Sequence, residues 1–121
     1  MNITEATKVL SDNYECTGES FFYYLYEECV FSVEKFWEYY DCIVAFVGQK
    51  DKDPEITKEI DYTYQKILKE FIYHFDPNDL TELKNFPENY TQYIERIEFA
   101  QAAYYRNNLA LIDDSIFDLQ R

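Results

Sequence analysis

The longest regular pattern of apolar residues runs from about Ser20 to Val47. Apolar side chains recur there every three or four residues, which is the spacing of one face of a helix. They are Phe21, Phe22, Leu25, Cys29, Val33, Phe36, Trp37, Tyr40, Ile43, Val44 and Val47. Gly48 comes next and suits the position just after a helix end. The pattern therefore predicts one continuous helix over residues 20–47.

Two further long helices are predicted after it. Asp53 as N-cap and Pro54 in the first turn begin one helix, which ends near Phe75 before Asp76 and Pro77. Its expected core stripe is Ile56, Ile60, Tyr64, Ile67, Leu68, Phe71, Ile72 and Phe75. The last long helix opens after 86–87 and bends or ends at 107–108. Its expected core face is Tyr90, Tyr93, Ile94, Ile97, Ala100, Tyr104 and Leu111.

Shorter elements are expected between and around these helices. Asn2 can cap a short helix over Thr4–Leu10, with Glu5 in the spacing of a capping box. A brief helix over residues 78–83 and a final turn over residues 114–119 complete the chain. The predicted fold is a single all-α domain over residues 1–121, an antiparallel bundle of three long helices with one or two short helices.

The last helix carries apolar residues on more than one side. Phe99, Ala102, Tyr105 and Leu109 lie largely off its core face. Either this helix is central and buried all round, or it exposes a patch for a partner or a second copy of the chain. We expect the first arrangement, and a homodimer stays open as the alternative.

The formal net charge is −13, and its distribution is uneven. Residues 1–48 hold nine acids and only two bases. Such a charge repels nucleic acid and anionic membranes and attracts basic partners. The chain has three cysteines and no C-x-x-C motif, which indicates reduced thiols. It shows neither a basic and apolar leader nor a long apolar run, so we expect a cytoplasmic protein.

The side chains that most enzymes need are scarce, so we expect no catalytic, cofactor or metal site. His74 is the one histidine, and with Glu70 it forms an i,i+4 pair that is too small to hold a metal. At the end of its helix we expect it to be a cation that the helix dipole favours. Cys29 falls on a core stripe as apolar filler, and two glycines exclude a phosphate-binding loop.

The candidate binding site is a ridge of acids on the outer face of the helix over residues 20–47. It consists of Glu27, Phe31, Glu34, Glu38 and Asp41, with Tyr24 and Glu28 beside it. Like charges four residues apart on a helix, such as Glu34 and Glu38, destabilise it by roughly 0.2–0.5 kcal/mol a pair. The next helix interleaves lysines among its acids, whereas this ridge has only Lys35 nearby. The ridge suits a basic protein surface, and a solvated acidic face without a partner is the alternative.

In size, charge, helical content and its tyrosine-rich acidic surface, the chain resembles small acidic bacterial immunity proteins. The resemblance implies a protein that binds and neutralises a cognate toxin, with a basic nuclease as the expected target. Two alternatives stay open: a nucleic-acid mimic that inhibits a restriction or CRISPR effector, and a dimeric helical scaffold or regulatory protein. An enzyme of another kind is the remotest alternative.

Overall fold

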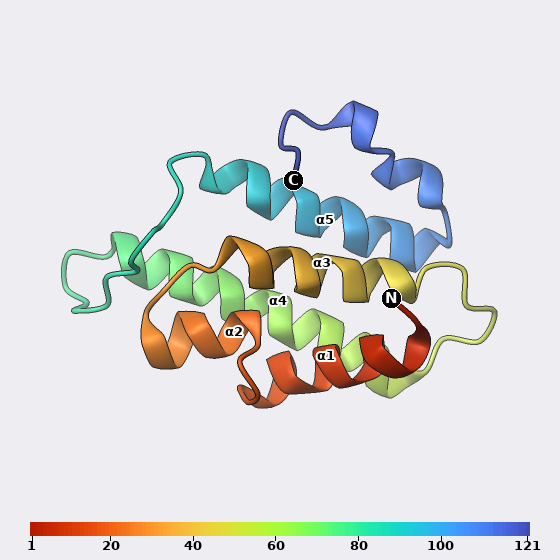
Figure 1. Ribbon diagram of the computed structural model, residues 1–121, viewed down its shortest axis with the longest axis horizontal. Helices are drawn as coiled ribbons and strands as arrows, with labels where there is room; N and C mark the ends of the chain where they lie inside the picture. The colour runs from red at the N-terminus through yellow and green to blue at the C-terminus, as the bar shows by residue number, and fades with distance from the viewer.

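Four helices form the body of the protein in the computed structural model, which describes residues 1–121. They are α1 (Ile3–Glu15), α3 (Val33–Ala45), α4 (Pro54–Phe75) and α5 (Tyr90–Arg106). The chain reverses direction from each of these helices to the next (Figure 1). The prediction of an all-α fold is confirmed, whereas the count of three long helices is not.

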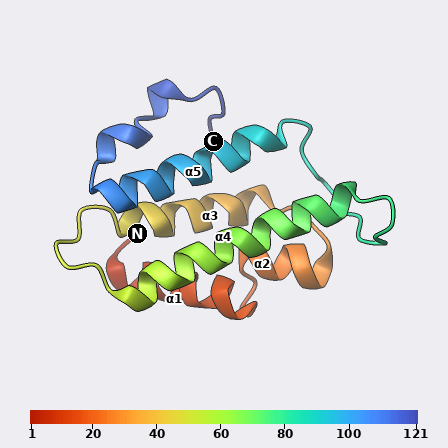
Figure 2. The same ribbon diagram turned by 180° about the vertical axis from the view of Figure 1, so that it is seen from behind.

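Short elements complete the fold. A turn of α-helix, α2 (Phe21–Tyr23), continues directly into a π-helix, η1 (Tyr24–Glu28). Two 3-10 helices, η2 (Leu109–Ile112) and η3 (Asp114–Ile116), follow α5. Seen from both sides, α1 and α2 lie along one edge of the molecule, and α5 with the C-terminal segment lies along the opposite edge (Figure 1 and Figure 2).

The helix ends follow the capping signals in the sequence. The Asn2 side chain accepts a hydrogen bond from the backbone N–H of Glu5 at 2.8 Å and donates one to its carboxylate at 3.0 Å. The Asn2 cap starts α1, which is longer than predicted, and Glu5 bonds the Asn2 side chain where a capping box would have it bond the backbone N–H. Asp53 caps α4, and Asn107 ends α5 in the left-handed conformation, as the sequence indicates.

The prediction of one continuous helix over residues 20–47 is wrong. The π-helix η1 ends at Cys29, whose φ of 53° is left-handed, and α3 starts only after Ser32 caps it. Between them, Phe31 donates a backbone hydrogen bond to the carbonyl of Lys84 at 2.9 Å. The Lys84 N–H in turn bonds the Cys29 carbonyl at 2.8 Å. The chain therefore leaves the helix to form a short bridge with a distant loop.

The break allows Phe31 to enter the core. Its side chain is 2% exposed, and its ring lies 5.3 Å from that of Phe21 and 5.1 Å from that of Tyr93. Burying a phenylalanine contributes roughly 1.5–3 kcal/mol, and the two backbone bonds with Lys84 replace part of the helical hydrogen bonding that the break removes. Phe31 therefore belongs to the core cluster and not to an exposed ridge.

The segment between α4 and α5 also differs from expectation. Residues 78–83 form no helix: Leu80 is fully exposed, while Leu83 is buried at 3% exposure. At the end of α4, Ile72 and Phe75 are exposed instead of belonging to the core stripe. The α4 helix extends beyond the elements it packs against, so its last turn has less to cover it (Figure 1).

The α5 helix is not buried all round, so the arrangement we expected is wrong. Phe99 and Tyr105 on α5 are 36% and 48% exposed, and Leu109, which lies beyond the helix on η2, is 59% exposed. One turn before Phe99, Arg96 is buried to 1% exposure beneath the C-terminal segment, and both side chains contact the Phe117 ring. No helix is long and apolar enough to cross a membrane.

Candidate protein-binding site

The structure divides the predicted acidic ridge between two elements. Tyr24, Glu27 and Glu28 lie on η1, whereas Glu34, Glu38 and Asp41 lie on α3 beyond the break at Cys29. Phe31 is excluded from it, because it is buried in the core. The seven residues therefore do not form one continuous face.

The two parts also differ in how their charges are balanced. Glu38 pairs with Lys35 at 3.2 Å, and Asp41 pairs with Arg121 at 2.6 Å. Glu27 and Glu34 are exposed and have no cation within ion-pair distance. Glu28 accepts a hydrogen bond from the Tyr23 hydroxyl at 3.3 Å. The free carboxylates thus gather around η1 and the first turn of α3.

Next to η1 the surface forms a hollow against α4, with a volume of about 360 Å³. We call it the η1–α4 hollow. Its lining residues are Cys16, Phe22, Tyr26, Lys66, Lys69, Glu70 and Tyr73. Phe22 and Tyr26 stack with 5.8 Å between ring centroids and 19° between planes, which gives the hollow one aromatic wall. Tyr26 is 58% exposed and Tyr73 is 37% exposed, so both rings are available to a partner.

The distinctive group of the η1–α4 hollow is the Glu70 carboxylate. Glu70 is 7% exposed as a residue, and its carboxylate makes no hydrogen bond and no ion pair within the fold. The carboxylate oxygens are not among the fully buried unpaired atoms, so they contact solvent at the hollow. Burial, and secondly the charge of Asp79, raise its pKa. Buried carboxylates are normally paired, and one that is unpaired in a hollow is a typical feature of a functional site.

The lysine one turn before Glu70 does not neutralise it. Lys66 instead donates to the backbone carbonyl of Tyr14 at 2.8 Å. Its ammonium group lies 4.8 Å from the centre of the Tyr14 ring and 5.7 Å from that of Phe22. Lys66 therefore ties the end of α1 to α4 and does not pair with Glu70. Lys69 also lines the hollow and makes no ion pair with Glu70, so the carboxylate stays unpaired although two lysines lie around it.

The hollow suits the binding of a cationic side chain better than catalysis. A carboxylate beside aromatic rings provides both an ion pair and a cation–π contact for an ammonium or guanidinium group. Burial raises the pKa of Cys16, and so does the charge of Glu27, which opposes the formation of a reactive thiolate. No group of three His, Cys, Asp or Glu side chains is placed to hold a metal ion.

A π-helix next to this hollow is itself informative. Single turns of π-helix are rare and occur often at functional sites, because they change the direction of side chains within a helix. Here the π-turn carries Tyr26 at the hollow and Glu27 and Glu28 beside it. Sequence reasoning found the two glutamates but missed Tyr26, Glu70 and Tyr73. The available signal was Glu70 itself, three residues after Ile67 on an otherwise apolar or neutral stripe of α4.

A second, more open hollow of about 540 Å³ lies between α1 and α3. It is lined by Glu5, Asp12, Glu19 and Glu38, but also by Lys8 and Lys35, which pair with two of these acids. It lacks an unpaired buried group, so the η1–α4 hollow is the stronger candidate.

Comparison of the chain with protein-family models, with curated proteins and with solved structures finds no match in any of the three.

Proposed function

We propose that this chain is a protein-binding inhibitor that recognises a basic protein through the η1–α4 hollow and the acids around it. The observation that carries the proposal is Glu70, a carboxylate at 7% exposure without a hydrogen-bond or ion-pair partner. A lysine or arginine side chain from a partner would supply the missing counter-charge. The fold already removes part of the water around Glu70, so this part of the desolvation cost is not added when the complex forms.

The aromatic side chains around Glu70 fit the same role. Tyr26 and Tyr73 offer rigid rings with a large contact area and a hydroxyl, and tyrosine is enriched among the residues that dominate binding energy. The ring faces attract a cation, by roughly 0.5–2 kcal/mol depending on exposure. Anchoring of one basic side chain in the hollow would position the rest of the partner over η1.

The overall charge supports recognition of a basic surface. Only five of the 24 acidic side chains lie within ion-pair distance of a cation: Asp12, Asp41, Glu38, Glu55 and Asp114. The remaining acids produce a negative field that accelerates encounter with a basic partner and weakens as salt is added. Glu27 and Glu28 concentrate part of this field beside the hollow.

In its specific form, the proposal is an immunity protein that blocks a toxin domain in the cytoplasm. A nuclease is the first candidate target, because a site that holds phosphates is built from cations that an acidic protein can cover. A nucleic-acid mimic that inhibits a restriction or CRISPR effector is a weaker candidate. Such mimicry would need a long regular line of acids, and the break at Cys29 interrupts the longest one.

A dimeric scaffold or regulatory protein is the second candidate function, on the basis of exposed apolar side chains on α5, η2 and η3. Phe99, Leu109 and Ile116 are 36%, 59% and 54% exposed. Sedimentation equilibrium tests this candidate directly. A reversible dimer in the wild type that Leu109→Glu dissociates would favour it over the binding of a basic partner.

The main test compares the wild type with Glu70→Gln, which keeps the shape of the side chain and removes its charge. Tagged protein is used to capture partners from lysate of the source organism, and mass spectrometry identifies them. Binding of the purified partner is then titrated. We expect a basic partner and a loss of about 30-fold or more in affinity for Glu70→Gln. Glu88→Gln, which removes an exposed charge just before α5 and outside the lining of the hollow, is the control and should bind as the wild type does.

Two outcomes would contradict the proposal. One is that no basic protein is captured, and the other is that Glu70→Gln binds the captured protein as tightly as the wild type. Co-expression with the partner tests the immunity function separately. Cells that carry a toxic partner should survive with the wild type and lose that protection with Glu70→Gln.

A further inference from the structure

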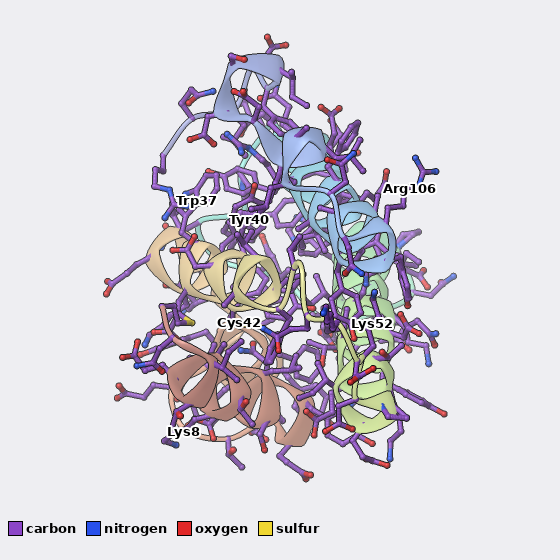
Figure 3. All side chains as sticks on the ribbon, turned by 90° about the vertical axis from the view of Figure 1, so that its right-hand side faces the viewer. Lys8, Trp37, Tyr40, Cys42, Lys52 and Arg106 are labelled. Carbon is purple, nitrogen blue, oxygen red and sulfur yellow. The ribbon has the colours of Figure 1, made fainter.

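Arg121 occupies a small site on α3 on the other side of that helix from α1. Its guanidinium donates two hydrogen bonds to the Asp41 carboxylate, at 2.8 Å to Oδ2 and 2.6 Å to Oδ1. The same group lies 4.7 Å from the ring centre of Trp37 and 6.0 Å from that of Tyr40. Both aromatic residues lie on the side of α3 that faces the C-terminal segment (Figure 3).

These contacts are the ones that proteins use to select arginine. The planar guanidinium matches the two oxygens of a carboxylate, and it stacks on an aromatic face, whereas a lysine ammonium does neither equally well. Trp37 is 8% exposed and Tyr40 is 3% exposed, so the aromatic floor is held in place by the core. The site is thus preformed to bind a guanidinium group, as it does that of Arg121.

Arg121 itself lies at the surface, whereas the segment before it is anchored in the core. The side chains of Arg121 and Asp41 are 51% and 36% exposed, so water and salt screen their ion pair. In contrast, the buried Arg96 donates to the carbonyl of Leu119 at 3.1 Å through Nε and at 2.6 Å through Nη2. Arg121 can therefore leave its site while Leu119 stays in place.

We propose that Asp41, Trp37 and Tyr40 form an arginine-binding site, which Arg121 fills in the free protein and an arginine of the basic partner fills in the complex. This inference rests on the proposed function, because it supplies a second anchor for the same partner beyond the η1–α4 hollow. Arg121 then acts as a tethered competitor. It shields the Trp37 ring in the free protein and must be displaced when the partner binds.

The site can be tested without any protein partner. Trp37 is the only tryptophan, so its indole N–H gives a single cross-peak in a proton–nitrogen NMR spectrum. The probe is N-acetyl-arginine amide, titrated into the wild type and into Arg121→Ala. We expect a saturable shift of the Trp37 peak in Arg121→Ala, with an apparent affinity about fivefold tighter than in the wild type because the tethered competitor is gone.

Three controls test whether the shift of the Trp37 peak reports the binding of a guanidinium group beside Asp41. N-acetyl-citrulline amide is neutral but has nearly the same shape, and it should cause no saturable shift. N-acetyl-lysine amide should bind several-fold more weakly than the arginine probe. Adding Asp41→Asn to Arg121→Ala should abolish the response. Arg121→Gln serves as a second opened variant if Arg121→Ala does not fold.

The inference is overturned if the arginine probe causes no saturable shift in either opened variant, or if citrulline shifts the peak equally. It is also overturned if the partner captured by the wild type binds Asp41→Asn and Arg121→Ala with unchanged affinity. We expect Asp41→Asn to weaken that complex and Arg121→Ala to tighten it. The titration with N-acetyl-arginine amide needs no partner protein. A negative result would therefore overturn the arginine-binding site while the η1–α4 hollow could still bind its target.

Discussion

The Nδ1 atom of His74 accepts a hydrogen bond from the backbone N–H of Leu83, with 2.9 Å between the two nitrogen atoms. A protonated imidazole could not accept this bond, so the expectation of a cation at the end of α4 is wrong. The ring also packs on Phe86, with 4.3 Å between centroids. His74 therefore pins the loop between α4 and α5 to the helix before it.

Replacing His74 by Ala should destabilise the protein by about 1–3 kcal/mol, because the N–H of Leu83 loses its partner and Phe86 loses a contact. Chemical denaturation followed by circular dichroism measures this loss. The neighbouring Ile72→Ala, at a position 63% exposed, should change the stability by less than about 0.5 kcal/mol. Equal effects of the two substitutions would show that the loop is not held by His74.

Arg96 should be the main anchor of the C-terminal segment. It is 1% exposed and bonds Asp114 at 2.9 Å and the Tyr40 hydroxyl at 3.2 Å, in addition to the carbonyl of Leu119. Its guanidinium lies 4.1 Å from the Phe117 ring centre. Arg96→Met should therefore cost about 2–4 kcal/mol, since it leaves buried polar groups without partners.

Hydrogen exchange distinguishes a released segment from general unfolding. In Arg96→Met, amides of residues 114–121 should exchange much faster, while those in the middle of α4 keep their protection. Arg106→Met makes the same replacement at an exposed position on α5 and should leave both stability and exchange nearly unchanged. Slow exchange of residues 114–121 in Arg96→Met would refute the anchoring role.

The fold could be predicted from the sequence wherever local signals were sufficient. Asn2, Asp53 and Asn107 act at the helix ends within a few residues, and the structure confirms each of them. The break at Cys29 could not be predicted in the same way. The spacing of apolar residues continues through it, and its cause is the pairing of Phe31 with Lys84, which lies far away along the chain.

The same limit explains what was missed in the candidate site. Glu27 and Glu28 are recognisable because acidic residues of one segment are visible as a cluster. Glu70 depends on how η1 packs beside α4 and on the direction that Lys66 takes, which is toward the carbonyl of Tyr14. Both are tertiary relationships, so a sequence pattern could place Glu70 on a helix but could not show that it lacks a partner.

Substitution of Phe31 distinguishes a continuous helix over residues 20–47, which exposes Phe31, from the broken helix, which buries it. On an exposed ridge, Phe31→Ala would hardly change the stability. In the core, where Phe31 is 2% exposed, the substitution should cost about 3–5 kcal/mol. Phe75→Ala is the matched control, because Phe75 is 55% exposed and its loss should cost less than half as much. Thermal or urea unfolding of both variants measures the difference.

Glu70→Gln should stabilise the free protein although it weakens partner binding. We expect a gain in the free energy of unfolding at pH 7 that is small, about 0.5 kcal/mol, compared with the roughly 0.5–3 kcal/mol by which most single substitutions destabilise a protein. The gain arises because the folded protein partly removes water from an unpaired carboxylate, which raises its pKa, as does the charge of Asp79. Glu88→Gln, at an exposed position, should show no such gain.

The pH dependence of the stability gained by Glu70→Gln follows from the direction in which the fold shifts the pKa of Glu70. Below the ordinary glutamate pKa of 4.5, the Glu70 carboxyl is protonated in both the folded and the unfolded chain, so the wild type and Glu70→Gln carry the same charge at this position. As the pH rises through 4.5 and then through the raised pKa of the folded state, ionisation favours the unfolded chain. The stability of Glu70→Gln relative to the wild type, measured by urea unfolding at a series of pH values, should therefore be small at about pH 4 and reach its full value by about pH 7. A difference that grows toward low pH would mean that Glu70 is stabilised by a partner within the fold, and would remove the reason to place a cation from another protein beside it.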